Sequence, residues 1–118
     1  MYVSVYVDGN HNGVLKTDIA KGVDRRIAGP RRLDSGAPGV RVGINDRVPA
    51  IPPDSGFLDT TDPIRFGTSN MVSFSPLGTA TPGTFYLASD TVQGAVRVNG
   101  ESARVRIMIF HGHRWSER

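Results

Sequence analysis

Short runs of alternating apolar and polar residues, separated by glycine and proline, extend through most of the chain. Successive side chains of a strand point to opposite faces, so this alternation is typical of strands with one buried face. The 118 residues include 14 glycines and 8 prolines, too many interruptions for long helices. The sequence therefore predicts an all-β fold, an antiparallel β-sandwich of about seven short strands.

The predicted strands are the segments with the clearest alternation, and they lie at 2–7, 40–44, 64–66, 71–75, 84–88, 95–98 and 102–110. At most one short helix is expected. Ile19, Val23 and Ile27 are four residues apart, Thr17 is a candidate N-cap and Asp18 suits a first helical turn. The proline-rich segment 45–63 is interpreted as a long surface connection.

The last two predicted strands are joined by Asn99-Gly100, a pair that favours a two-residue hairpin turn because both residues tolerate positive φ. Arg97 would then face Ser102 across the hairpin. Arginines would share the outer face of this hairpin, and apolar side chains would cover the core. The predicted core-facing positions are Val96, Ala103, Val105, Ile107 and Ile109.

The formal net charge is +3, and acidic and basic residues cancel up to Asp90. The excess therefore lies at the C-terminal end. Arginine suits bidentate phosphate contacts, and Trp115 could stack on a base. The candidate nucleic-acid-binding residues are Arg97, Arg104, Arg106, Arg114 and Arg118. The alternative interpretation is an ordinary solvated face, as an amphipathic strand requires.

A candidate calcium loop begins at Asp8, where the pattern Asp-x-Asn-x-Asn-Gly resembles the first half of an EF-hand loop. The candidate ligands are Asp8, Asn10, Asn12 and Asp18. The carboxylate of Asp18 arrives one residue too early for the usual last ligand, and Asp24 could replace it only by folding back. A hydrogen-bonded turn at a strand end is the alternative interpretation.

The composition and motifs favour a protein that is not an enzyme. The chain contains no cysteine, which excludes disulfides and thiol catalysis. It also has no Gly-x-Ser-x-Gly elbow and no phosphate-binding glycine loop. No segment reaches the roughly 18 consecutive apolar residues of a membrane span. The length suits a single domain over 1–118.

Three segments resemble the GspH/FimT family of minor pseudopilins. Residues 71–87, Met-Val-Ser-Phe-Ser-Pro-Leu-Gly-Thr-Ala-Thr-Pro-Gly-Thr-Phe-Tyr-Leu, are similar to its strand–turn–strand signature. Ala103–Arg106 falls where the family often ends with Gly-Arg-Val-Arg, so an alanine replaces a glycine here. The acidic turn within 6–14 also resembles a feature of some members.

The resemblance implies a filament subunit of a bacterial type II secretion system or type IV pilus, located in the periplasm or at the cell surface. Its expected partners are other pilin subunits and, through an N-terminal helix, the inner membrane. Nothing before Tyr2 can be that helix. Some relatives in DNA-uptake pili bind DNA through arginines near the C-terminus. A DNA-binding minor pilin and a calcium-stabilised extracellular β-module are therefore the two alternative functions.

Overall fold

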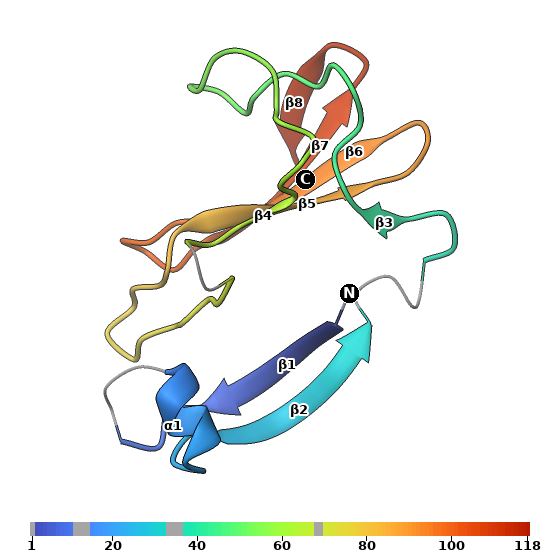
Figure 1. Ribbon diagram of the computed structural model, residues 1–118. Helices are drawn as coiled ribbons and strands as arrows, with labels where there is room; N and C mark the ends of the chain where they lie inside the picture. Colours follow the sequence, from blue (N-terminus) through green and yellow to red (C-terminus); the bar gives the residue numbers. More distant parts are fainter. Residues whose placement is uncertain (1, 11–14, 33–36, 68–69) are drawn as a thin grey trace. The chain divides into compact units, whose positions relative to one another are not determined.

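The computed structural model describes residues 2–10, 15–32, 37–67 and 70–118 of the chain (Figure 1). These residues form two compact units, Met1–Gly36 and Ala37–Arg118. The smaller unit contains β1 (Tyr2–Val7), α1 (Lys16–Ala20) and β2 (Arg25–Arg32). The strands of the larger unit are β3 (Arg41–Val42), β4 (Ile64–Arg65), β5 (Gly83–Ala88), β6 (Gln93–Val98), β7 (Val105–His111) and β8 (Arg114–Glu117).

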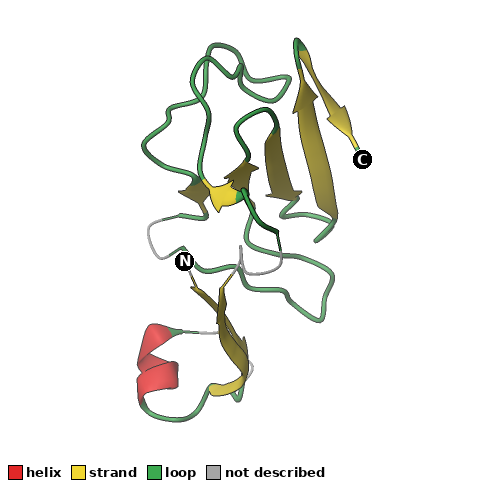
Figure 2. Cartoon of the chain, turned by 90° about the vertical axis from the view of Figure 1, so that its right-hand side faces the viewer, coloured by secondary structure: helices red, strands yellow, loops and turns green. Residues whose placement is uncertain are grey.

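Every strand pair among the described residues is antiparallel. The smaller unit has a two-stranded sheet of β1 and β2, and the larger sheet has the order β3-β5-β6-β7-β8, with β4 also paired to β5. Long loops connect β3 to β4 and β4 to β5, whereas shorter turns join β5 to β8 in sequence (Figure 2). The predicted antiparallel all-β fold with at most one short helix is therefore confirmed. That the chain is a single domain over 1–118 stays a prediction.

The helix α1 is shorter than the sequence spacing suggested. Gly22 takes a φ of 77° directly after the C-cap residue Lys21. The amide of Gly22 donates to the carbonyl of Ile19, and the amide of Val23 donates to that of Asp18. These two bonds form a Schellman motif, which ends a helix with a left-handed glycine. The helix therefore stops before Val23.

Two details of the predicted helix are wrong. Leu15 occupies the N-cap position, without a side-chain cap, where Thr17 was expected. Ile27 lies in the strand β2 rather than on a helix. Asp18 does lie in the first helical turn, as predicted.

The β6–β7 hairpin has a wider turn than the two residues expected. Val98 pairs with Val105 and Arg97 pairs with Arg106, so the loop spans 99–104 and Arg97 does not face Ser102. The Asn99 side chain explains the difference, because its Oδ1 accepts hydrogen bonds from the amides of Glu101 and Ser102 at 3.0 and 3.1 Å. The shift is an even number of residues, so the same side chains are still grouped together on each side of the hairpin.

The core lies on the opposite face of the sheet from the one expected. Its buried side chains are Ile44, Val48, Ile51, Leu58, Tyr86, Ala95 and Met108. Four of these lie between β3 and β4, and three of them, Val48, Ile51 and Leu58, come from the segment 45–63 that was predicted to be a surface connection. This segment arches past β7 and β8 in Figure 1. Arg97 lies two residues after Ala95 on β6, and residues two apart on a strand share a face. The arginines therefore lie on the same face of the sheet as the core. The predicted core residues Val105 and Ile107 are each 50% exposed.

A buried glutamine fixes that connection to the sheet. Gln93 on β6 is 2% exposed, and its Oε1 accepts a 2.7 Å hydrogen bond from the Asn45 amide. Its Nε2 donates to the carbonyls of Gly43, Leu87 and Gly94, each at 3.1 Å. A buried amide is stable only when its polar atoms are paired in this way. Gln93 therefore positions the start of the segment that covers the core.

Candidate binding surfaces

An arginine row crosses the core-side face of the larger sheet at one end. The strand register places Arg65, Thr84, Arg97 and Arg106 opposite one another on β4, β5, β6 and β7. Arg104, which directly precedes β7, adjoins the row. The sequence pattern indicated that Arg97, Arg104 and Arg106 share a face. The sequence pattern did not place Arg65 in this row, because the residues of β4 do not reveal that β4 pairs with β5.

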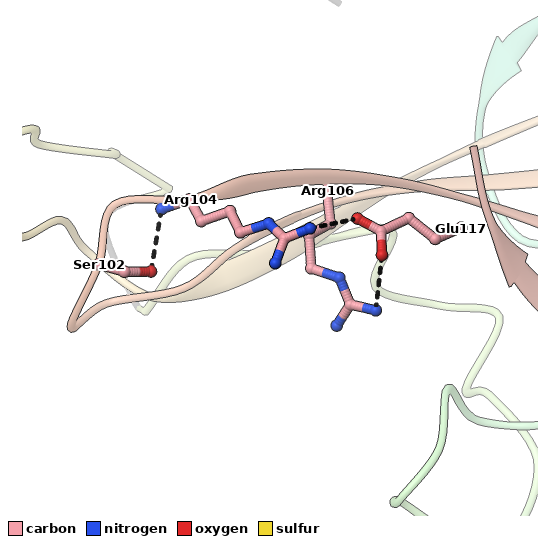
Figure 3. Close-up of polar contacts among 4 residues, drawn as sticks. All are labelled: Ser102, Arg104, Arg106 and Glu117. Atoms are coloured by element: carbon pink, nitrogen blue, oxygen red, sulfur yellow. Dashed lines mark hydrogen bonds and ion pairs between the residues drawn. The ribbon is translucent and has the colours of Figure 1, made fainter.

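Carboxylates offset much of the charge of this arginine row. Glu117 accepts from Arg104 at 3.2 Å and from Arg106 at 3.3 Å, so one carboxylate holds two guanidinium groups (Figure 3). Asp54 pairs with Arg97 at 3.4 Å. These pairs are solvent-accessible, and each stabilises the fold by roughly 0–1 kcal/mol. Their main effect is to reduce the positive potential of the row.

Arg65 is held by the backbone and lies over an aromatic ring. Its Nε and Nη2 atoms donate to the carbonyls of Asp62 and Asp59, both at 2.9 Å. Its guanidinium carbon lies 5.3 Å from the ring centroid of Tyr86, within the range of a cation–π contact. Burial raises the pKa of Tyr86, although the charges of Arg65 and Arg97 act in the opposite direction.

The C-terminal residues contribute to the fold as well as to the surface charge. Trp115 Nε1 donates to the carbonyl of Pro49 at 2.8 Å, and its ring stacks on Phe110 with centroids 5.6 Å apart. Trp115 therefore packs against the core instead of projecting toward a nucleic-acid base. Arg114 is exposed on β8, and the backbone amide of Arg118 donates to the carbonyl of Ile107 at 2.8 Å.

The candidate calcium residues are only partly brought together. The Asn10 amide donates to Asp8 Oδ1, and Asn10 Nδ2 donates to Asp18 Oδ2, both at 3.2 Å. The first bond is that of an Asx turn. Asn12 lies outside the described residues. Within the described ranges, no group of three or more His, Asp or Glu side chains is arranged to hold a metal ion. Calcium binding stays a prediction.

Asp24, which could replace the last calcium ligand only by folding back, does contact the ends of this loop, but through the backbone. It is 2% exposed. Its Oδ1 accepts from the amide of Gly9 at 2.9 Å, and its Oδ2 accepts from the amide of Leu15 at 3.0 Å. Both oxygens are thus committed to backbone donors. A calcium-dependent rise in melting temperature that Asp8→Ala abolishes would support the calcium prediction.

The outer face of the larger sheet carries an apolar row. Ile64, Phe85, Val96 and Ile107 lie opposite one another on β4 to β7. In the neighbouring positions, Val42 pairs with Leu87 and Gly94 pairs with Ile109. On this face Val105 and Ile107 are each 50% exposed, whereas Ile64, Phe85 and Val96 are only partly exposed. Exposed apolar surface commonly marks a protein–protein interface, so the β7 part of this face is a candidate docking surface.

No family model, curated protein or solved structure matches the chain. Among the residues that the structure describes, no helix has the length and apolar character needed to cross a membrane.

Proposed function

We propose that this chain is the globular part of a minor pseudopilin, a structural subunit near the tip or at the assembly point of a type II secretion or type IV pilus filament. The observation that carries the proposal is the apolar row on the outer face of the larger sheet. The resemblance of residues 71–87 to the pseudopilin signature supports it independently. The role is structural and non-enzymatic, and a periplasmic or cell-surface location belongs to the same proposal.

In this proposal, the apolar row is buried in the contact with neighbouring subunits of the filament, and this burial stabilises the assembly. Val105 and Ile107 are each 50% exposed, and complete burial of such a side chain is worth about 1.5–3 kcal/mol. Covering the exposed half of each contributes about 1 kcal/mol. A lysine at position 107 would place a charge in this interface without entering the core on the other face.

The experiment compares assembly in cells that lack the gene and are complemented with variants. We expect Ile107→Lys to fail to restore filament assembly or secretion and to keep the wild-type melting temperature. Leu77→Lys is the matched control, because Leu77 is 91% exposed and lies in a turn outside every strand. Normal assembly with Ile107→Lys, or in the deletion strain itself, would contradict the proposal.

The sequence encoded immediately upstream of Met1 provides a second test. A pseudopilin requires a Gly-Phe-Thr-Leu-x-Glu processing junction followed by about 20 apolar residues. Finding an unrelated folded domain at that place would exclude the pseudopilin proposal while leaving the docking surface to be explained.

Nucleic-acid binding at the C-terminal arginines is the second candidate function. It is favoured by the register pairing of Arg97 with Arg106, and weakened by the carboxylates that neutralise them. An anisotropy titration at several salt concentrations tests it. Arg104→Gln with Arg106→Gln should flatten the logarithmic salt dependence by about two units, if each contacts one phosphate of duplex DNA. An unchanged slope would show that Arg104 and Arg106 do not contact DNA phosphates and are ordinary solvent-exposed side chains.

A further inference from the structure

The strand β2 carries exposed arginines at both ends. All eight of its residues, Arg25–Arg32, are exposed, with arginine at positions 25, 26, 31 and 32. The side chains of Arg25, Arg26 and Arg31 make no ion pair within the part of the chain that the structure describes. They therefore differ from Arg97, Arg104 and Arg106, whose charges are partly offset by carboxylates.

The pairing of β1 with β2 sorts these side chains onto two faces. Val3 pairs with Arg31, Val5 with Ala28 and Val7 with Arg25, and directly opposed residues share a face. We call this surface the valine face; it consists of Val3, Val5, Val7, Ala28, Arg25 and Arg31. An apolar centre lies on it between two arginines.

The opposite face of the ribbon has a different composition. Tyr2 pairs with Arg32 and Tyr6 pairs with Arg26, and Ser4 lies between the tyrosines. The aromatic side chains thus lie on the face away from the valines.

The valines are not the core of their own unit. Val3, Val5 and Val7 are 38%, 47% and 44% exposed. Among the described residues of the smaller unit, the buried side chains are those of Asp18 and Asp24, both acidic. A shallow groove of about 580 Å³ lies at one end of the ribbon, where Val3, Val5, Ala28 and Arg31 line it together with Gly29, Pro30 and Arg32.

We propose that the valine face binds the surface of an anionic lipid bilayer. Arg25 and Arg31 contact lipid phosphates, and the valines enter the boundary between headgroups and acyl chains. A bilayer offers anionic and apolar layers one above the other, which matches arginines placed around an apolar centre. A single-stranded nucleic acid would instead use phosphate contacts together with aromatic stacking, but both tyrosines lie on the other face.

The first experiment measures co-sedimentation of the full chain with vesicles of mixed phosphatidylglycerol and phosphatidylcholine, and with phosphatidylcholine alone. We expect binding to the anionic vesicles, weakened by salt. Because each basic residue near an anionic surface contributes about 1 kcal/mol, Arg25→Gln with Arg31→Gln should weaken binding roughly 30-fold. The charge-matched control Arg104→Gln with Arg106→Gln should retain most of it. Equal losses from the two double variants would show a diffuse charge effect and overturn the proposal.

The second experiment identifies the face that meets the lipid and does not depend on an arginine variant. The chain has no cysteine, so Val5→Cys and Ser4→Cys can each be labelled with one environment-sensitive fluorophore. Anionic vesicles should shift the emission to the blue for a label at position 5 and leave a label at position 4 nearly unchanged. Equal shifts, a stronger shift at position 4, or binding to a single-stranded oligonucleotide without vesicle binding would each overturn the proposal. All readouts use the isolated chain, so they are independent of filament assembly.

Discussion

The two units of the molecule are stabilised in different ways. The larger unit buries a cluster of apolar side chains that includes Ile44, Tyr86 and Met108. In the described part of the smaller unit, the buried residues are Asp18 and Asp24. Apolar burial contributes about 25 cal/mol per Å², so it stabilises the larger unit far more. The smaller unit depends mainly on backbone hydrogen bonds and on carboxylates that accept them.

The two units therefore depend on different residues for their native geometry. A core tolerates the replacement of one apolar side chain by another of similar volume, so the geometry of the larger unit depends mostly on the buried amide of Gln93. In the smaller unit the geometry depends on Asp24 and on the left-handed Gly22. A two-stranded ribbon is marginally stable alone, so we expect the smaller unit to open before the larger one.

Replacing Gln93 with leucine should destabilise the larger unit most. The change removes the acceptor of the Asn45 amide and the two Nε2 hydrogens that three backbone carbonyls share. At about 1 kcal/mol for each net bond, the free energy of unfolding should fall by about 3 kcal/mol. Chemical denaturation followed by Trp115 fluorescence measures it, with exposed Thr91→Ala as the control. A loss below about 1 kcal/mol would contradict the role given to Gln93.

Replacing Asp24 with alanine should open the smaller unit alone. The amides of Gly9 and Leu15 lose a charged acceptor, and such bonds are worth about 1.5–3 kcal/mol. Hydrogen exchange should show faster exchange of the β1 and β2 amides, with the β6 and β7 amides protected as before. Asp90→Ala, an exposed change in the larger unit, is the control. If the amides of both units exchanged faster to the same extent, the two units would unfold together and the prediction would be wrong.

Tyr86 should make the larger unit sensitive to alkaline pH. Burial raises its pKa in the folded state, so the folded protein retains the phenolic proton more strongly than the unfolded chain does. Stability is then complete below the unfolded pKa of about 10 and decreases as the pH rises above it. Tyr86→Phe should reduce this decrease. An identical pH dependence of the melting temperature in both proteins would exclude the effect.

Replacing Glu117 with glutamine should have a small effect on stability. It removes the carboxylate shared by Arg104 and Arg106, and exposed pairs of this kind contribute roughly 0–1 kcal/mol each. The melting temperature should fall slightly at low salt and hardly at all at high salt, because salt screens the pairs. A fall that persists unchanged at high salt would show that Glu117 acts through packing instead.

Replacing Ala103 with glycine should stabilise the larger unit slightly. Ala103 has a φ of 56°, a conformation that costs a residue with a Cβ about 1–2 kcal/mol. Glycine removes this strain but loses more chain entropy on folding, so the net gain should be about 0.5 kcal/mol. Ala103→Val should destabilise the same turn. A lower melting temperature for the glycine variant would show that the Ala103 methyl group contributes favourable contacts.

The strands with regular alternation could be predicted from the sequence, and β1, β5 and β6 lie where they were expected. The strand β2 was missed because Gly29 and Pro30 interrupt it. Proline is tolerated at a sheet edge, and β2 pairs only with β1 among the described strands. The segment 71–75, predicted as a strand, contributes only the isolated bridge between Phe74 and Ala80.

The choice of the covered face could not be predicted, because both faces of β7 are apolar. Met108 and Phe110 lie on one face, and Ile107 and Ile109 lie on the other. The segment containing Val48 and Ile51 decides between them, and its route depends on long-range bonds such as that of Gln93 to Asn45. Likewise, alternation placed the arginines together, but their pairing with Glu117 requires β8 beside β7.

The carboxylate of Asp24 has a consequence for protein engineering. Because it holds the amides of Gly9 and Leu15, the two ends of the intervening segment are fixed from outside that segment. Residues can therefore be inserted after Asn10 without altering these attachment points or the bonds of Asn10 to Asp8 and Asp18. Each doubling of a flexible loop costs only about 0.6 kcal/mol in closure entropy. This position is thus a natural site for inserting a peptide epitope or an affinity tag within the folded chain.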